Sequence, residues 1–347
     1  MTDTLAALRE YACAADAESI WPESSWYALR RGGVLTWCIP KSYGGEGRDG
    51  LELLGGYERL ASACLTTCFI LSQRDAACRR LRDSGNLVLA RELLPALAQG
   101  RQFATVGISQ LTTSRQHVKP AMIARQSGDD FVLDGVMPWV TGAARADYFV
   151  SGAALEDGRQ ILAVLHRDRP GVVVGPPLEL MALQGSLTAE VRCEEVLLER
   201  EWLLAGPVEK VMAPGKGGAG GLETSCLALG LAGAAIDYLE QEAVARLELK
   251  PTTERLQQAR TLLRDALHQA AKEGATAELA SSLRARANTL VLRATQAALT
   301  ASKGIGFLRN HPAQRWARQA LFFLVWSCPR PAVDATMAYL TPDTCDA

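Results

Sequence analysis

The chain has 347 residues, 48% of them hydrophobic, and a formal net charge of −1 at pH 7. This length predicts two or three domains with a large core, and the near-neutral charge gives no basis for binding nucleic acid or an anionic membrane. The nine cysteines form no C-x-x-C pair and the four histidines lack metal-ligand spacing, so we expect no disulfide framework and no metal site. No run of 18 apolar residues and no leader-like start is present, which favours a cytoplasmic protein.

Three blocks follow one another along the chain. Residues 1–100 are rich in Ala, Leu and Arg and have helical periodicity, interrupted by a glycine-rich loop at Tyr43–Gly47. Residues 101–205 carry short alternating apolar runs separated by turn signals, which predict an antiparallel β-domain. Residues 206–347 begin with a glycine-rich linker and return to helix. Their long periodic segments are Leu227–Leu239, Glu254–Glu273 and Ala277–Ala301.

The most informative pattern lies in the β block, where residues 137–150 read MPWVTGAARADYFV. On a strand, residues i and i+2 face the same way. Trp139 and Thr141 would therefore present an aromatic plate and a hydroxyl to one surface. A planar heteroaromatic cofactor needs both a face on which to stack and a polar group at its ring edge. The alternative is a half-buried strand whose tryptophan packs in a core.

This stretch resembles the Trp-(Ile/Val)-Thr segment of the acyl-CoA dehydrogenase family, and other landmarks follow in family order over most of the chain. The similar segments are Val34–Gly47, Leu94–Gly100, Leu183–Val196 and Lys303–Phe322. The resemblance implies an N-terminal helical domain, a middle antiparallel β-domain and a C-terminal four-helix bundle, with FAD between the β-domain and the bundle. It also implies a homodimer or homotetramer that oxidises an acyl group carried by CoA or an acyl carrier protein, with an unknown electron acceptor.

The same resemblance implies a flavin site. Trp139 matches the tryptophan behind the flavin, Thr141 matches the threonine near its reactive nitrogen, and Ser109 matches the residue at its pyrimidine end. The loop after Ser109 departs from the family's glycine-rich pattern, but it offers hydroxyls and an arginine as phosphate ligands. These candidates are Thr113, Ser114 and Arg115. A polar surface turn between strands is the alternative.

The acid–base half of the site fits the family less well. A carboxylate must remove the α-proton of the acyl group, and in the commonest subfamilies it is a glutamate at the position of Ser327. An unassisted serine hydroxyl cannot act as a base near neutral pH. Other subfamilies place a Glu and an Arg where this chain has Gly220 and Gly221. Glu223, three residues after Gly220, is the remaining candidate base, and a helix-start carboxylate favoured by the helix dipole is the alternative.

The adenine end also departs from the family. Arg246–Pro251 replaces its R-x-x-F-G, and Thr300–Gly304 replaces its Q-x-x-G-G, so the resemblance does not extend to the residues that hold a neighbouring subunit's FAD. Three functions remain open. They are an FAD-dependent, acyl-CoA dehydrogenase-like oxidoreductase, a flavin-dependent oxidase or monooxygenase on the same fold, and a flavin-free remnant that binds an acyl chain or a protein.

Overall fold

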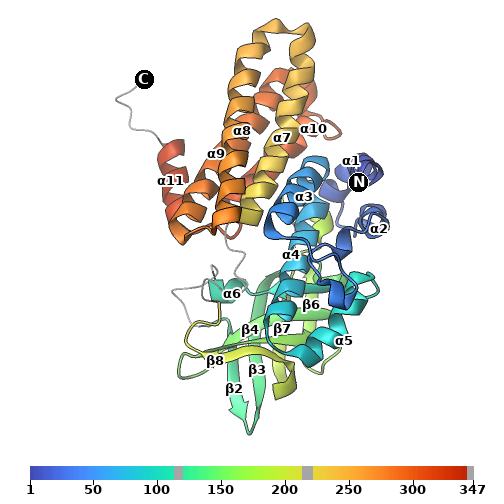
Figure 1. Cartoon of the computed structure of the whole chain (residues 1–347), viewed down its shortest axis with the longest axis vertical. Coiled ribbons are helices and arrows are strands. Elements are labelled where there is room, and N and C mark those ends of the chain that lie inside the picture. Colours follow the sequence, from blue (N-terminus) through green and yellow to red (C-terminus); the bar gives the residue numbers. More distant parts are fainter. Residues whose placement is uncertain (113–119, 213–221, 342–347) are drawn as a thin grey trace.

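The structure, a computed structural model, describes residues 1–112, 120–212 and 222–341 (Figure 1). Helices form both ends of the chain and a sheet forms the middle, so the expected order of helical domain, β-domain and helical bundle is confirmed. The N-terminal helices are α1 (Thr2–Ala17), α2 (Glu23–Arg31), α3 (Gly50–Ala63), α4 (Leu65–Asp83) and α5 (Leu87–Ala98).

Helix α4 is the central element of the N-terminal domain. It packs on strand β1 of the sheet and on helix α7 of the bundle, and it lies between the bundle and the sheet in Figure 1. Phe69 belongs to the core shared by the N-terminal helices and the bundle, whereas the next residue, Ile70, belongs to the core of the sheet. Different faces of one helix therefore contribute to the two hydrophobic cores.

The middle domain is an eight-stranded sheet with the order β6-β7-β3-β2-β4-β5-β8, and β1 pairs with β4 outside this path. The strands are β1 (Ala104–Gly107), β2 (Met122–Ser127), β3 (Asp130–Val140), β4 (Tyr148–Ala154), β5 (Gln160–His166), β6 (Val172–Pro177), β7 (Ala189–Leu198) and β8 (Leu203–Val208), with the short helix α6 (Ser109–Thr112) after β1. The expected antiparallel pairing is found in five of the strand pairs, but β1 runs parallel to β4 and β2 meets β4 in a parallel bridge. The sheet also passes the expected boundary at residue 205, since β8 continues to Val208.

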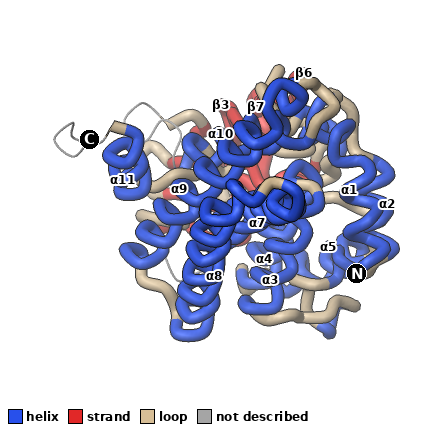
Figure 2. Tube along the Cα trace, turned by 90° about the horizontal axis from the view of Figure 1, so that it is seen from above, coloured by secondary structure: helices blue, strands red, loops and turns tan. Residues whose placement is uncertain are grey.

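The C-terminal domain is a bundle of α7 (Leu222–Ala245), α8 (Lys250–Glu273), α9 (Ala277–Ser302) and α10 (Pro312–Val325), with α11 (Arg330–Leu340) packed on α9. The three long periodic segments are thus confirmed as α7, α8 and α9. Seen from above, α7 is surrounded by neighbouring helices (Figure 2). Among the described helices, α7 alone is long and apolar enough to cross a membrane, although the sequence has no unbroken run of 18 apolar residues. Because 67% of its apolar window is buried in the fold, α7 is packed as a core helix.

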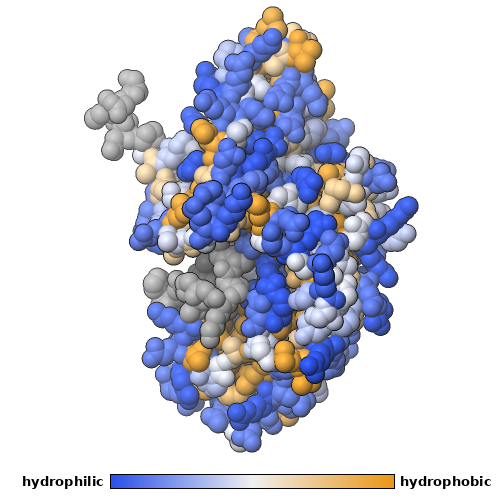
Figure 3. Space-filling view, in the orientation of Figure 1, coloured by the Kyte–Doolittle hydropathy of each residue, from blue (hydrophilic) through white to orange (hydrophobic). Residues whose placement is uncertain are grey.

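Hydrophilic residues dominate the face of the bundle shown in Figure 3. Hydrophobic residues appear there in scattered patches, which is ordinary for a folded domain. The cores lie instead within the bundle and under the sheet.

Candidate functional site

Trp139 is the next-to-last residue of β3, which ends at Val140. Its side chain is 41% exposed, so the alternative of a tryptophan packed in a core does not hold. Thr141 is only 1% exposed. The pairing of β3 with β7 is irregular between Met137 and Val140, and strand alternation therefore does not extend to this pair. The expectation that both side chains face one surface is therefore wrong, because Trp139 is accessible whereas Thr141, just beyond the end of β3, is buried.

The Thr141 hydroxyl belongs to a small buried network. Its oxygen lies 3.4 Å from the Thr188 hydroxyl, which lies 2.9 Å from the Ser186 hydroxyl. The backbone also joins these segments, because the N–H of Gly142 donates to the carbonyl of Ser186 at 2.8 Å. The turn between residues 183 and 188 therefore fixes the rotation of the Thr141 side chain.

Asp16 anchors that turn, a role that no pattern in the sequence predicts. Its buried carboxylate accepts hydrogen bonds from the N–H of Leu183 at 2.9 Å, from Arg318 at 2.7 Å and from Gln319 at 2.7 Å. These partners come from the loop before β7 and from α10, while Asp16 belongs to α1. One carboxylate thus joins all three parts of the chain beside the Thr141 network.

Ser109 begins α6, at the end of β1. The next residue, Gln110, fixes this corner, because its amide donates to the carbonyls of Gly107 and Gly152, both at 3.0 Å. The side-chain oxygen of Gln110 is buried and has no hydrogen-bond partner among the described residues. This corner therefore offers a buried acceptor to a ligand. The candidate phosphate ligands Thr113, Ser114 and Arg115 lie outside the described residues.

Ser327 follows α10, in an exposed turn with a positive φ of 41°. The preceding Trp326 stacks on Phe322, with ring centroids 5.3 Å apart, and meets Phe69 of α4 edge-on at 4.8 Å. Buried Arg284 donates to the carbonyl of Trp326 at 2.8 Å, and burial lowers the pKa of Arg284 to about 10. The turn that carries Ser327 is therefore fixed by the ring packing of Trp326 and by the hydrogen bond from Arg284.

Glu223 is the second residue of α7, and its carboxylate lies 3.3 Å from the guanidinium of Arg79 on α4. The positions Gly220 and Gly221 lie outside the described residues. Phe69, which contacts the Ser327 turn, and Arg79 are ten residues apart, which corresponds to about 15 Å along a helix. Helix α4 therefore passes both candidate catalytic residues, although no hydrogen bond or ion pair joins Ser327 to Glu223 in the described structure.

The adenine-end residues make contacts within their own bundle. Arg246 donates to the carbonyl of Ala301 at 2.6 Å and pairs with Glu242 and Glu248 at 3.4 and 3.3 Å. Its guanidinium is thus committed to joining α7 to the end of α9. This agrees with the departure of the sequence from the family at this point.

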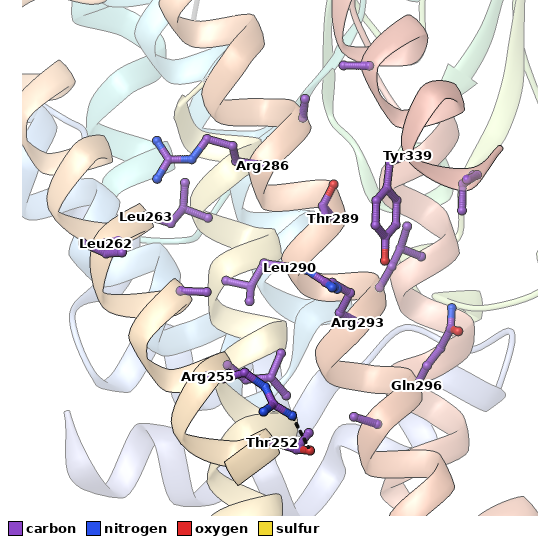
Figure 4. A pocket seen from close by; sticks show the side chains of 17 residues that line it. Thr252, Arg255, Leu262, Leu263, Arg286, Thr289, Leu290, Arg293, Gln296 and Tyr339 are labelled. Atoms are coloured by element: carbon purple, nitrogen blue, oxygen red, sulfur yellow. Dashed lines mark hydrogen bonds between the residues drawn. The ribbon is translucent and has the colours of Figure 1, made fainter. Parts of the chain in front are cut away.

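A groove of about 780 Å³ lies between α8, α9 and α11 (Figure 4). Arg255, Arg293 and Tyr339 line it together with leucines, and Arg255 donates to the Thr252 hydroxyl at 3.3 Å. None of the residues predicted from the sequence to bind flavin or to catalyse a reaction lines this groove. It is therefore separate from the candidate site around Trp139.

Comparisons with known proteins agree with this architecture. The family profile described as "Acyl-CoA dehydrogenase, N-terminal domain" matches residues 5–101. A probable acyl-CoA dehydrogenase of Mycobacterium tuberculosis is 24% identical over 201 residues, which are 57% of this chain and 52% of that protein. The chain thus spans about half the length of the curated relatives that it first matches.

Two solved structures share the whole fold. Butyryl-CoA dehydrogenase from Megasphaera elsdenii has a TM-score of 0.83 at 20% identity, covering 98% of this chain and 97% of that chain. A prolyl acyl carrier protein oxidase has a TM-score of 0.77 at 19% identity, covering 98% of each chain. At this level of identity, these similarities establish the fold.

Proposed function

Because the chain belongs to the acyl-CoA dehydrogenase family, we propose that it is a flavin-dependent oxidoreductase that acts on an acyl thioester. The observation that carries this proposal is the accessible Trp139 near the end of β3, in the segment that resembles the flavin-binding strand of the family. The acyl group would be carried by CoA or by an acyl carrier protein. We further propose a cytoplasmic homodimer or homotetramer, as the family resemblance implies.

The described residues fit a flavin ring. Trp139 offers an accessible face for stacking, and the fixed Thr141 hydroxyl can donate to a ring edge. The buried oxygen of Gln110, next to Ser109, is an acceptor for a ring N–H. A bound flavin would supply the acceptor for a hydride from the β-carbon of the acyl group. We propose FAD as this flavin, with its phosphates held by Thr113, Ser114 and Arg115.

The chain offers only weak candidates for the general base that would remove the proton from the α-carbon of the acyl group. Ser327 stands on a rigid turn but is not a base near neutral pH. The family's two base positions are occupied by Ser327 and Gly220, and the carboxylate nearest to either in the sequence is that of Glu223, three residues after Gly220. Arg79 forms an ion pair with this carboxylate. We therefore propose that conventional acyl-CoA dehydrogenation is slow in this protein.

The lack of a carboxylate at position 327 favours a second candidate function. A flavin-dependent oxidase or monooxygenase on the same fold would need no carboxylate base at that position. Anaerobic addition of acyl-CoA distinguishes the dehydrogenase from the oxidase or monooxygenase. In a dehydrogenase, the substrate reduces the bound flavin stoichiometrically, so the flavin absorbance is lost.

The decisive experiment is an absorbance scan of the purified protein for bound flavin, followed by titration with FAD and with FMN. We expect Trp139→Ala to reduce flavin retention and to change flavin fluorescence, since stacking area is lost. Tyr27→Ala, at another exposed aromatic residue (61% exposed), is the matched control. If the wild-type protein bound neither flavin at micromolar concentration, the proposal would fail and the flavin-free remnant would take its place.

A further inference from the structure

The groove between α8, α9 and α11 combines an apolar floor with unbalanced positive charge (Figure 4). Leu263 and Leu290 line it and are only 2% and 5% exposed. Three exposed arginines, Arg255, Arg286 and Arg293, line it as well. None of the 17 lining residues is Asp or Glu, so the groove carries three positive charges and no negative one.

The fold gives these arginines contacts but no counter-charge. Arg255 donates to the Thr252 hydroxyl at 3.3 Å, and the guanidinium of Arg293 lies 5.7 Å from the ring centroid of Tyr339 on α11. Within the described part of the chain, no carboxylate lies within ion-pair distance of Arg255, Arg286 or Arg293. A partner that brings carboxylates to the groove would therefore meet arginines whose charge is still available.

The lining residues of α8 and α9 have the spacing of a helix-packing surface. On α8 they are Thr252, Arg255, Leu256, Ala259, Leu262 and Leu263, and on α9 they are Ala285, Arg286, Thr289, Leu290, Leu292, Arg293, Gln296 and Ala297. Steps of three and four residues keep one face of each helix toward the groove over about three turns, or about 16 Å. Two such stripes side by side form the kind of surface against which a third helix packs.

The size of the groove fits a helix better than a small molecule. A three-turn helix about 16 Å long and 10 Å wide occupies about 1,300 Å³, so a groove of about 780 Å³ accommodates over half of it. Two of the lining leucines, Leu262 and Leu340, remain 57% and 49% exposed. A small ligand usually buries about 70–90% of its surface in an enclosed pocket, whereas a helix lying in an open groove would cover these leucines.

Symmetric dimerisation through the groove is disfavoured by its charge. In a twofold contact the same patch of both copies meets, so the arginines of one copy would face those of the other. Like charges placed opposite each other oppose association. The groove therefore fits a different partner, one that carries acidic residues.

We propose that this groove binds an acidic amphipathic helix of a partner protein. The apolar face of that helix would lie on the leucines, and carboxylates beside that face would pair with Arg255, Arg286 and Arg293. Guanidinium groups bind carboxylates through two parallel hydrogen bonds, and an apolar groove contacts a docked helix at positions i, i+3 or i+4, and i+7. None of the candidate flavin-binding or catalytic residues lines the groove, so this inference is independent of the proposed function.

Fluorescence anisotropy with designed peptides and the purified full chain tests this proposal. The probe is a labelled peptide of about 18 residues, long enough to form a helix, with leucines at the spacing i, i+3 and i+7 and glutamates beside them. One control peptide carries lysine in place of each glutamate, and another carries a central proline that breaks the helix. We expect the acidic peptide to bind at least about 10-fold more tightly than either control, and to bind more weakly as salt is raised.

Matched variants locate the binding. Arg255→Gln combined with Arg293→Gln should weaken binding of the acidic peptide about 10-fold, because two carboxylates lose their partners. Arg9→Gln combined with Arg91→Gln removes the same charge from exposed positions of α1 and α5 and should leave the affinity unchanged. Because all four positions are exposed, both double variants should keep the unfolding temperature of the wild type.

The proposal would be overturned if the wild type bound the acidic peptide no better than the lysine or proline peptide, or if both double variants lost affinity equally. A change of oligomeric state in Arg255→Gln with Arg293→Gln, measured by gel filtration, would assign the groove to a second copy of the chain instead. Peptide binding that requires deletion of residues 342–347, which contain Asp343 and Asp346, would assign the groove to that segment and equally overturn the proposal.

Discussion

Replacing Asp16 by alanine should destabilise the protein and weaken its hold on flavin. The carboxylate accepts three hydrogen bonds from the loop before β7 and from α10. Breaking a buried ion pair by removing one partner costs about 3–5 kcal/mol. Arg318 is 32% exposed and also donates to the carbonyl of Met181 at 2.7 Å, so it can be rehydrated in the variant. We therefore expect a loss near the lower end, about 3 kcal/mol of unfolding free energy.

Urea unfolding followed by tryptophan fluorescence measures this loss, and gel filtration measures the flavin that remains bound. Asp16→Asn should lose less, because the amide oxygen can still accept from the N–H of Leu183. Glu10→Ala, at an exposed position of the same helix, should change stability by no more than about 0.5 kcal/mol. A loss below 1 kcal/mol in Asp16→Ala, with flavin retention unchanged, would refute the idea that this network positions the Thr141 turn.

Further substitutions test the helix packing and the proposed chemistry. In Gly230→Ala, the new Cβ would lie 2.3 Å from the backbone carbonyl oxygen of Glu58, so α3 and α7 must separate; we expect a loss of about 1–3 kcal/mol in urea unfolding, and wild-type stability would contradict this packing. Ser327→Glu should raise acyl-CoA oxidation with an artificial acceptor, since a general base is worth about 10²-fold to 10⁴-fold, and no gain in a flavin-loaded variant would count against the assigned position. Any wild-type turnover should fall in Glu223→Ala if Glu223 is the base, whereas full turnover would place the base elsewhere.

The sequence predicts the order of the domains well because the relevant signals are local. Periodicity over many residues identifies α7, α8 and α9, and turn signals separate the strands of the sheet. The parallel pairing of β1 with β4 is not predictable in this way. Its partners, such as Val106 and Val150, are 44 residues apart, and only the folded chain brings them together.

In the candidate site, too, the sequence predicts residues that have a local signal and misses those placed by long-range contacts. Trp139 stands out in the sequence because it lies two residues before Thr141 in a segment that resembles the acyl-CoA dehydrogenase family, and the structure leaves Trp139 accessible. Asp16 gives no such signal, since an acidic residue near the end of an amphipathic helix normally faces solvent. It is buried because α10, some 300 residues later, covers it.

Helix α4 contains buried charged residues that its sequence does not predict. Its segment RDAACRRLRD from Arg74 to Asp83 has the composition of a solvated face, yet Arg74, Arg79 and Arg80 are all buried. The burial arises because α4 packs between strand β1 and helix α7, so neither of these faces meets water. Charges kept in such a place reduce stability unless they are paired. Arg74 is paired within its own helix and Arg79 across to α7, whereas Arg80 donates to the carbonyl of Ala76 in its own helix, so local pattern alone predicts the partner of none of these three buried arginines.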